Sequence, residues 1–480
     1  MMNLNPVLTI ALPLILAFTK IMYRRIANLF LIVGSLINIF VVMFLKEGQY
    51  LMGGYRPPFG IILQVDTYAL YSLLVLNVLF AALMLLVTKK AENLTSSSLI
   101  ALAALNGLIL TGDLFNLFVF LEIATIAALI LVSSIKKYHQ AFNYMVAGAI
   151  GSTFYLLGLG LLYKQYGTLN MARMHELMAA SPSGSAVAVI LIFIGLAVEI
   201  KLMPFSSWAA GVLKNADEWI GPMIGAIYGG VMMIVVGRLF TDIFVMDAKV
   251  RLMLSLLTLI TLVGGEAAAF QSRKVREVLL YSGVAQAGLE ALLILNGYPA
   301  IGFILVLSNM TAKYVMFLLA GYMAEEAGGD DFDRLTGVFR SNPVHGFAFT
   351  VAGLSLAGLP LFFGFIVKLN LLYNLMLSHS YWLPALILSA SLVEGIYMLR
   401  MILGLWRLPE GHRGGLQVRI LGSSHRRKYA VYTISMVLSL ALILFGLAPD
   451  NALSIARRAR GADTDGKPLV LITMKGGIGQ

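Results

Sequence analysis

Charged residues occur inside stretches of this sequence that are otherwise apolar enough to cross a membrane. Lys201, Lys313 and Lys368 each lie in such a stretch, and Glu122 lies in another. A lysine at the centre of a bilayer costs roughly 2.5–3.5 kcal/mol even on a lenient insertion scale. Acids and bases that are kept in a membrane despite this cost are typical of proton relays, because both can gain and release protons. These four residues are the candidate carriers of a proton pathway.

Glu122 and Lys201 are predicted to form the input pair of this pathway. A buried carboxylate needs a partner, and Lys201 is the candidate partner of Glu122. One interpretation is a static ion pair that fixes two helices together. The other is a switchable pair, in which separation of the two groups makes Lys201 readier to release its proton. A lysine can do this, whereas an arginine stays charged.

Lys313 and Lys368 are predicted to be the intermediate and the terminal carrier. The neighbours Ser308, Asn309 and Thr311 could hold water for a relay beside Lys313. The structural alternative for Lys313 is a lysine that extends toward a membrane interface. For Lys368 it is a charge near the end of a half-helix. The polar neighbours favour the relay.

A second group of charged residues consists of four glutamates in apolar stretches: Glu199, Glu266, Glu290 and Glu394. Local pairing and relay roles are both open for them. Glu199 is two residues before Lys201, and this spacing places the two about 160° apart on a helix, on different faces. Glu394 is six residues before Arg400, so a pair between them would be less direct than an i,i+4 pair.

Other kinds of chemistry find no support in the sequence. The six histidines all lie in loops or at the ends of predicted helices, which argues against a histidine relay or a metal site. The absence of cysteine excludes disulfides and iron–sulfur clusters held by this chain. The sequence contains no Ser/His/Asp grouping, nucleotide loop or HExxH motif. We expect no cofactor, metal or redox centre on this chain, so any redox chemistry would belong to partner subunits.

The elements that must position these residues are membrane-spanning helices. Hydrophobic residues make up 59% and charged residues 12% of the chain, and its mean hydropathy is +0.86. A span needs about 20 apolar residues. We predict an all-α integral membrane protein with about fourteen spans, at 5–19, 26–45, 67–88, 97–111, 114–135, 142–163, 186–204, 220–240, 250–270, 277–295, 298–323, 345–372, 382–405 and 429–447.

Two of these spans, the seventh and the twelfth, are predicted to be broken. Pro204 follows Lys201 by three residues, and Pro360 lies in Gly358-Leu-Pro-Leu-Phe-Phe-Gly364, shortly before Lys368. Proline removes a backbone donor and clashes with the preceding turn. Interrupted helices in corresponding positions of two halves are a pointer to a transport pathway.

An internal repeat follows from the spacing of the intramembrane charges. Glu122 and Glu290 are separated by almost the same number of residues as Lys201 and Lys368. Residues 97–245 and 246–405 would then be two five-helix units, and the odd number of crossings makes the second inverted relative to the first. Residues 1–96 would form the three N-terminal helices, and residues 406–480 a basic loop, the last helix and the tail.

The arrangement of charge predicts the orientation of the chain in its membrane. The net charge is +11, but most basic residues lie in alternate loops, as expected for cytoplasmic loops and not for nucleic-acid binding. With the N-terminus outside, the outer loops carry Lys46, Arg56, Lys164, Arg173, Arg238, Lys249 and Arg251. The basic tail around Arg457 disagrees with this orientation. We expect the cell membrane of a prokaryote, with the basic loops facing the cytoplasm. The acidic segment 324–344 is interpreted as a solvated loop, in preference to a cation site.

These stretches together resemble the antiporter-like large membrane subunits shared by respiratory complex I, Mrp cation/proton antiporters and energy-converting membrane-bound hydrogenases, with related sulfur-reducing complexes. The similarity is strongest from the fourth to the thirteenth span. The motifs that carry it are Asp113-Leu-Phe-Asn-Leu-Phe-Val-Phe-Leu-Glu122, Lys201 with Pro204, Trp208 and Asp217, Lys313, and the stretch from Leu354 to Lys368.

The resemblance implies fourteen helices, two inverted repeats and a central hydrophilic axis that carries protons. It also implies partners: small antiporter-type subunits, a redox arm in some members, and H⁺ or Na⁺ as the transported ions. One departure concerns the eighth span, where many relatives carry a lysine and this chain has an apolar stretch with Ile234 near that position. Water or Tyr228 could replace the lysine, or the transfer could be lost. The long lateral helix of one complex I relative is absent here, which favours the shorter members.

Three hypotheses follow. The first is a proton-translocating subunit of a multisubunit membrane complex, coupled to a redox arm or to sodium exchange. The second, motivated by the apolar eighth span, is a structural subunit that keeps the fold and does not conduct. The third is a stand-alone solute transporter with a similar number of spans.

Overall fold

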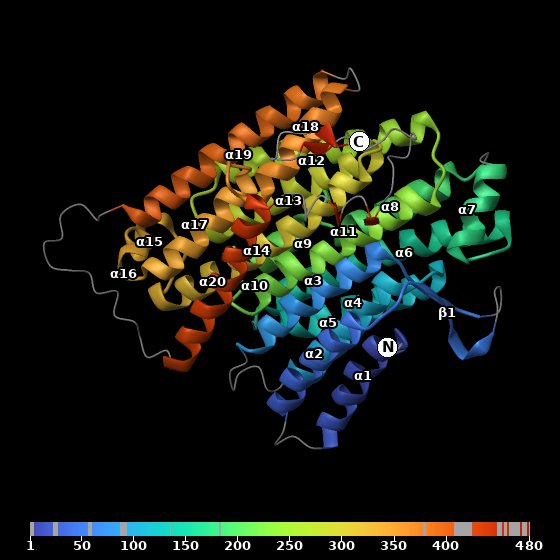
Figure 1. Ribbon diagram of the computed structural model, residues 1–480, viewed down its shortest axis with the longest axis horizontal. Helices are drawn as coiled ribbons and strands as arrows, with labels where there is room; N and C mark the ends of the chain where they lie inside the picture. The colour runs from blue at the N-terminus through green and yellow to red at the C-terminus, as the bar shows by residue number, and fades with distance from the viewer. Residues whose placement is uncertain are drawn as a thin grey trace, which may run out of the picture.

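The protein is described by a computed structural model. It covers residues 4–22, 27–55, 60–86, 94–134, 136–181, 184–377, 381–407 and 425–448, with two-residue pieces at 454–455, 458–459, 471–472 and 478–479. Its helices run roughly along one direction and form a single bundle, with α1 and α2 along the lower edge in Figure 1 and α19 along the upper left edge.

Helices account for nearly all the regular structure of the described residues. They are α1 Val7–Met22, α2 Ala27–Met43, α3 Thr67–Met84, α4 Thr95–Leu110, α5 Leu114–Ser133, α6 Tyr138–Tyr166, α7 Met171–Ala180, α8 Ala186–Glu199, α9 Ser207–Leu213, α10 Ile220–Pro222, α11 Gly229–Arg238, α12 Ala248–Gln271, α13 Val275–Leu295, α14 Pro299–Ala327, α15 Phe332–Leu335, α16 Val338–Ser341, α17 Pro343–Ala357, α18 Phe363–Leu377, α19 Trp382–Trp406 and α20 His425–Leu447. The π-helical turn η4 Met223–Tyr228 joins α10 to α11, and a second one, η5 Leu239–Ile243, extends α11, so that Ile220–Ile243 forms one span.

Each predicted span coincides with a helix, or with a helix that is interrupted. Among the described residues, nine helices are long and apolar enough to cross a membrane, and shorter apolar helices lie at the other predicted spans. The sequence did not predict strands. The structure has an antiparallel pair, β1 Gly48–Leu51 and β2 Ile62–Val65, with the short η2 turn Met52–Gly54 after β1, and the two-residue pair β3 Leu471–Ile472 and β4 Ile478–Gly479.

The predicted break in the seventh span is confirmed. Helix α8 ends at Glu199, α9 begins at Ser207, and Lys201 between them has a left-handed backbone with φ 63°. The indole N–H of Trp208 donates to the Val198 carbonyl over 3.0 Å, and the Met203 N–H donates to the Thr261 hydroxyl over 3.1 Å. Neighbouring side chains thus bind the backbone groups that the break releases, as a membrane interior requires.

The twelfth span is broken in the same manner, between α17 and α18. Helix α17 ends before Gly358, whose φ of 76° suits a residue without a side chain. The Gly364 N–H donates to the Ser355 hydroxyl over 3.3 Å. The Lys368 ammonium donates to the Leu356 carbonyl over 2.9 Å. Both breaks therefore lie beside a buried lysine.

Loop contacts divide the bundle into two ends. The capped end carries Asp66, Asp113 and Asn170, whose side chains cap α3, α5 and α7, and the backbones of Gly112 and Met171 are hydrogen-bonded to each other there. The capping groups accept N–H bonds that the first helical turns leave unpaired.

The opposite, ion-paired end holds three salt bridges between basic and acidic loops. Arg276 contacts Asp330 at 3.0 Å, Lys214 contacts Glu277 at 3.3 Å, and Lys274 contacts Asp331 at 3.9 Å. The acidic segment 324–344 is thus partly neutralised by the basic residues next to α13. The alternation of loops between the two ends follows the predicted crossings.

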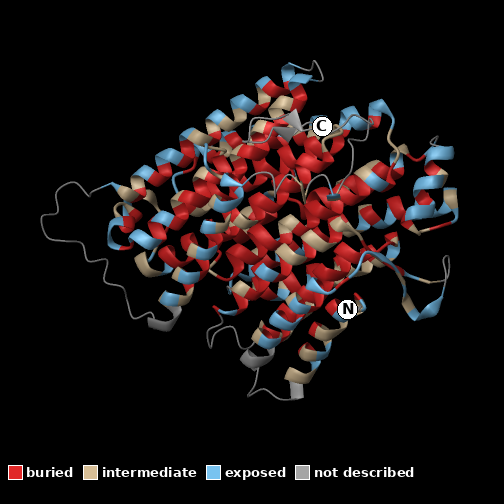
Figure 2. Cartoon of the chain, viewed as in Figure 1, coloured by how far each residue is buried: buried red, intermediate tan, exposed pale blue. Residues whose placement is uncertain are grey.

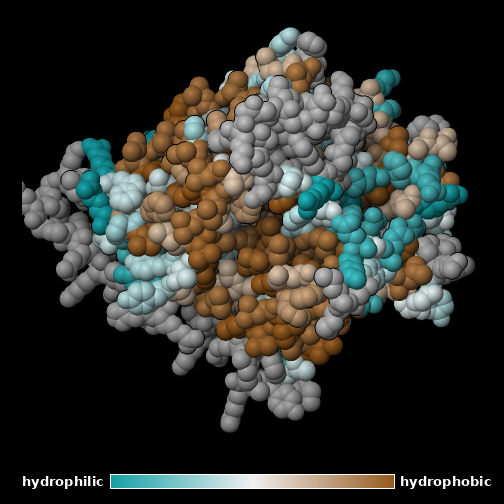
Figure 3. Space-filling model, viewed as in Figure 1, coloured by the Kyte–Doolittle hydropathy of each residue, from teal (hydrophilic) through white to brown (hydrophobic). Residues whose placement is uncertain are grey.

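Burial is concentrated along the centre of the bundle. Figure 2 shows a buried interior, with exposed residues on the outer helices. Helix α14 and the span from α10 to η5 lie at this centre, since 94% and 89% of their most apolar windows are buried. Figure 3 shows apolar surface across the middle of the visible face and hydrophilic side chains toward its left and right ends. This pattern is expected of a membrane-embedded bundle.

Candidate functional site

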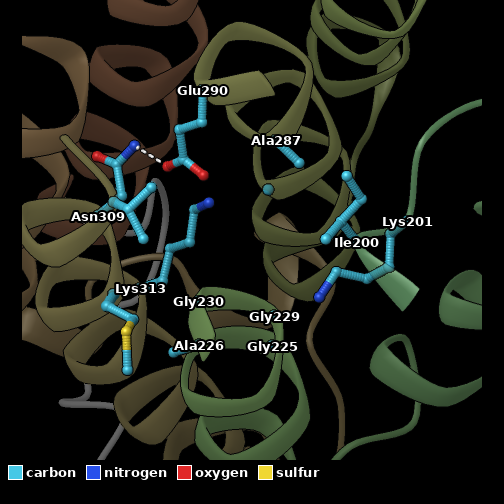
Figure 4. A pocket seen from close by; sticks show the side chains of 13 residues that line it. Ile200, Lys201, Gly225, Ala226, Gly229, Gly230, Ala287, Glu290, Asn309 and Lys313 are labelled. Atoms are coloured by element: carbon cyan, nitrogen blue, oxygen red, sulfur yellow. Dashed lines mark hydrogen bonds between the residues drawn. The ribbon is translucent and has the colours of Figure 1, made fainter. Parts of the chain in front are cut away.

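A small internal cavity brings together the seventh, tenth and eleventh predicted spans. Lys201, Glu290, Asn309 and Lys313 supply its polar lining, and glycines of the eighth span supply part of its wall. The volume available to the centres of water molecules is about 20 Å³, and one water needs roughly 10–15 Å³ of such volume. Lys201 and Lys313 enter the cavity from opposite sides, and the Lys313 ammonium points toward the Glu290 carboxylate (Figure 4).

Lys201 lies against the eighth span. Its ammonium is 3.3 Å from the Ile224 carbonyl in η4. The next residue after η4, Gly229, is in contact with this ammonium, and a Cβ atom at position 229 would overlap it. Lys201 is 5% exposed, and it forms no ion pair with any carboxylate in the described part of the chain. Lys313 likewise forms none there.

A row of hydrogen bonds leads from this cavity to Lys368. Asn309 donates to Glu290 over 2.7 Å and to the side-chain oxygen of Gln286 over 3.0 Å. Gln286 donates to both oxygens of Glu394 over 2.7 Å. Glu394 in turn forms an ion pair with Lys368 at 2.8 Å. Two amides therefore connect two buried glutamates, and the second glutamate is paired with the lysine.

Glu122 does not contact Lys201, so the predicted direct pair is wrong. The Glu122 carboxylate accepts a hydrogen bond from the Ser152 hydroxyl on α6. The break after Glu199 explains the difference, because it gives Lys201 a left-handed backbone and directs its side chain into the central cavity. The spacing of residues along the sequence does not reveal this change of direction.

Glu199, two residues before Lys201, lies on the other side of the break, next to α5. Its Oε1 atom is 3.4 Å from the Thr125 hydroxyl, which is itself 2.9 Å from the Tyr228 hydroxyl. Its Oε2 atom is buried and has no hydrogen-bond partner among the described residues. The different faces that the sequence predicts for Glu199 and Lys201 are therefore observed.

The remaining predicted residues occupy the far end of the row. Glu266 is 5% exposed, and its Oε2 atom has no hydrogen-bond partner in the described part of the chain. The pair between Glu394 and Arg400 is not formed. Arg400 donates to the carbonyls of Phe270 and Ser272 instead, and the Glu394 carboxylate is paired with Lys368.

Arg238 also differs from its predicted position. The sequence placed it with the outer loops, whereas it is 6% exposed at the end of α11. Its Nη2 atom donates to both oxygens of Asp66 over 2.8 and 2.9 Å, and its Nη1 atom donates to the Ile109 carbonyl over 3.0 Å. Its guanidinium lies 5.5 Å from the centre of the Tyr68 ring. Arg238 is an internal anchor of the capped end.

The eighth span carries no lysine, and at the predicted position the Ile234 carbonyl accepts a hydrogen bond from the Tyr68 hydroxyl over 2.7 Å. Gln286 in the row, Thr125 beside Glu199 and Ser152 beside Glu122 were not predicted from the sequence. Each is a neutral residue in an apolar helix, and a polar group in a predicted span is the signal that could have identified it. In the described part of the chain, no group of three or more His, Asp or Glu residues could hold a metal ion.

Comparisons with known proteins agree with this architecture. The profile of a family described as "NADH:quinone oxidoreductase/Mrp antiporter, TM" matches residues 111–393. The chain is 27% identical over 477 residues to a subunit of the Na⁺/H⁺ antiporter of Bacillus subtilis, with 94% of this chain and 95% of the relative covered. It is 28% identical over 430 residues to a subunit of the NADH-quinone oxidoreductase of Desulforudis audaxviator, with 85% and 86% covered.

Solved structures show the same fold. A chain of the membrane-bound sulfane sulfur reductase, an archaeal respiratory membrane complex, superposes with a TM-score of 0.84 at 27% identity, with 97% of this chain and 98% of that chain covered. A chain of the Mrp complex from Dietzia sp. gives a TM-score of 0.82 at 20% identity, with 95% and 96% covered.

Proposed function

Because the chain belongs to the NADH:quinone oxidoreductase/Mrp antiporter transmembrane family, we propose that it moves protons across its membrane as a subunit of a multisubunit complex. The coarse function, an antiporter-like membrane subunit, rests on the family. The proposed pathway rests on this chain's own residues. Its carriers are Glu122, Lys201, Lys313 and Lys368, with Glu199, Glu266, Glu290 and Glu394 as carriers or partners.

The observation that carries the proposal is the shared cavity of Lys201, Glu290 and Lys313. An unpaired ammonium at membrane depth is expensive, and it is tolerated where water or a counter-charge can reach it. The cavity has room for water between the two lysines. A lysine that is not held by a carboxylate can pass a proton to a neighbouring amine and regain one later.

The chemistry of one passage follows from the geometry. A proton leaves the Lys201 ammonium through water in the cavity and reaches the neutral amine of Lys313. Glu290 faces both groups and stabilises whichever of them is charged. The amides of Asn309 and Gln286 carry no proton onward, but they hold Glu290 and Glu394 in fixed positions. Lys368 releases its own proton beside Glu394 and, as a neutral amine, takes up the proton of the Lys313 ammonium through water, which returns Lys313 to the neutral amine.

The driving force and the partners are proposed from the relatives. The Bacillus subtilis antiporter chain and the sulfane sulfur reductase chain belong to complexes named for ion exchange and for a redox reaction. We propose small antiporter-type subunits as neighbours, with a redox arm or Na⁺ exchange as the coupled process. The division into two inverted units, 97–245 and 246–405, belongs to the same proposal. So does a prokaryotic cell membrane with basic loops toward the cytoplasm.

The test is proton movement by the assembled complex in sealed vesicles with a pH-sensitive dye inside. Lys201→Ala and Lys368→Ala should each lower the rate by roughly a hundredfold, the lower range for loss of a proton-transfer group. Lys249→Ala, at an exposed residue, is the matched control and should keep the parental rate. Parental rates in both test variants would show that the protein has a structural role and does not conduct. Full activity of the purified single chain would instead favour the stand-alone transporter.

A further inference from the structure

We propose that Glu199 carries the proton between Glu122 and Lys201, and that Thr125 and Tyr228 position it. This inference rests on the proposed function and names a step within it. The predicted direct pair of Glu122 and Lys201 is not formed, so the two need a connecting group. Glu199 is a buried carboxylate at the junction between them.

The contacts of Glu199 differ from those of a structural carboxylate. Its side chain is buried, at 1% exposure, and its Oε1 atom lies 3.4 Å from the Thr125 hydroxyl. The other oxygen has no partner among the described residues. Buried polar atoms in folded proteins are nearly always hydrogen-bonded, so an exception needs an explanation. An oxygen that receives and releases a proton or binds a transient water is such an explanation.

On one side, Glu199 lies next to α5 and α6, one turn along these helices from Glu122 and from its partner Ser152. Glu122 and Thr125 are three residues apart on α5, so they share a face. On α6, Ser152 binds Glu122, and Gly148 lies one turn before Ser152. A Cβ atom at Gly148 would be 3.1 Å from the Thr125 methyl and 3.9 Å from Glu199 Oε1. Because Gly148 has no side chain, α6 can pack closely against the Thr125–Glu199 contact.

On the other side, the break of the seventh span separates Glu199 from Lys201. Both side chains are buried, and the left-handed backbone at Lys201 turns the lysine into the central cavity. If α8 continued without a break, Glu199 and Lys201 would both project from the same helix, and the backbone at Lys201 would not turn its side chain toward Lys313. A non-glycine residue in this conformation is uncommon and is found where the surrounding structure enforces it. The break thus gives an acid on the input side and a base on the cavity side.

The turn η4 of the eighth span contacts both Thr125, the neighbour of Glu199, and Lys201. The Tyr228 hydroxyl, at its end, is 2.9 Å from the Thr125 hydroxyl, and the Ile224 carbonyl, in the same turn, is 3.3 Å from the Lys201 ammonium. A π-helical turn inside an α-helical span is rare and often occurs at functional sites. The eighth span of this chain has no lysine. It contributes to the proposed transfer through the Tyr228 hydroxyl and the Ile224 carbonyl.

The transfer is balanced as a proton exchange. The Glu122 carboxylic acid loses a proton to the Glu199 carboxylate, by way of water or the hydroxyls between them. Glu199 then passes its proton to the neutral amine of Lys201, which becomes an ammonium. Each hydroxyl can accept a hydrogen bond from one neighbour while it donates to the other. The proton on Lys201 is the one released into the cavity.

The test uses the assembled complex in sealed vesicles. Glu199→Gln keeps the size of the side chain and removes its ability to carry a proton, so we expect a loss of roughly a hundredfold in proton movement. Glu199→Asp keeps the carboxylate and should recover part of this rate. The yield of intact complex from each variant shows whether the fold is kept. A Glu199→Gln complex that assembles and pumps at the parental rate would overturn the inference.

The positioning residues need a measurement that a structural role would not change. Tyr228→Phe and Thr125→Val remove one hydroxyl each, and both should shift the dependence of the pumping rate on pH. Thr125→Ser keeps the hydroxyl and should restore the parental pH profile. An unchanged profile in Tyr228→Phe and Thr125→Val would contradict the positioning role.

Comparison with the lysine variants separates the two levels of the proposal. If Lys201→Ala stops proton movement and Glu199→Gln does not, the proposed function survives and the role of Glu199 is wrong. If neither change has an effect, the proposed function itself fails. If both stop movement, both levels are supported.

Discussion

At the scale of single residues, each lysine beside a helix break lies against a glycine. Gly229 contacts the Lys201 ammonium, and a Cβ atom at Gly358 would be 2.6 Å from Lys368 Cδ. Both ammonium groups also donate to a backbone carbonyl, that of Ile224 or Leu356. The missing side chain gives each lysine a place inside the bundle, and the carbonyl takes part of its charge.

Gly229→Ala should therefore impair transport while leaving the lysine in place in the sequence. The added methyl group occupies the position of the Lys201 ammonium, which must move out of contact with Ile224 and into the cavity. We expect the pumping rate to fall by about tenfold, an effect of about 1.4 kcal/mol.

Gly160→Ala is the matched control, since position 160 on α6 has open space around it. Alanine favours the helical state over glycine by up to about 1 kcal/mol, so this variant should be at least as stable as the parent. Equal pumping by the Gly229→Ala and Gly160→Ala complexes would contradict the packing of Lys201 against Gly229.

The Lys368–Glu394 pair allows structural and functional effects to be distinguished. Glu394→Gln leaves a buried ammonium without its counter-charge, and removal of one partner of a buried pair costs roughly 3–5 kcal/mol. The double variant Lys368→Met/Glu394→Leu removes both charges and should recover most of this loss. We expect the thermal midpoint of the complex to fall in the single variant and to return in the double variant, with no return of pumping. A double variant that pumps normally would remove Lys368 from the pathway.

The sequence identified the intramembrane charges but not all their partners. Lys201, Lys313 and Lys368 could be found because a charge in an apolar stretch stands out. Partner choice depends on the rotation of each helix and on the backbone at the break, and no spacing rule encodes these. Glu122 was therefore assigned to Lys201, and Glu394 was considered with Arg400.

At the scale of elements, the predicted breaks were found because proline and glycine have direct backbone consequences. The details of each break were not predictable. In the seventh span α8 ends at Glu199, before Lys201, whereas in the twelfth span Lys368 lies on the helix that follows the break. The π-helical turns η4 and η5 also have no clear sequence signal.

The eighth span is fixed at the capped end by the Arg238–Asp66 pair. Arg238→Ala should lower the thermal midpoint of the complex, because the Asp66 carboxylate and the Ile109 carbonyl lose their donor. The Asp66 side chain is 36% exposed and can bind water, but the Ile109 carbonyl lies in a residue that is 2% exposed, and a buried group left unsatisfied costs about 1–3 kcal/mol. Arg238→Lys should recover only part of the loss, since lysine cannot bind both carboxylate oxygens with a planar fork.

Arg173→Ala provides the comparison for Arg238→Ala. Arg173 forms a salt bridge with Glu176, but the two side chains are 60% and 62% exposed. Such surface pairs contribute little to stability. Equal midpoints for Arg173→Ala and Arg238→Ala would show that the internal pair does not hold α3 to α11.

At the scale of the whole molecule, the chain separates into an apolar middle and two polar ends, and this followed from composition and hydropathy. The family and the fold class were also predictable, because several motifs of the family occur together. A helix lies at each predicted span, and the described ion pairs hold loops at one end together. Which end faces the cytoplasm depends on the membrane and on the charges around it, so it needs a direct measurement.

The orientation can be measured with single cysteines, because the natural chain has none. We expect Lys137→Cys and Lys274→Cys to be protected from a membrane-impermeant maleimide in intact cells, and Arg173→Cys and Lys249→Cys to react. All four positions are exposed in the structure, so protection would reflect the membrane and not burial. After the membrane is opened, all four should react. The expected pattern follows from the retention of basic loops on the cytoplasmic side. Reaction at Lys274→Cys in intact cells, with protection at Lys249→Cys, would show the opposite orientation.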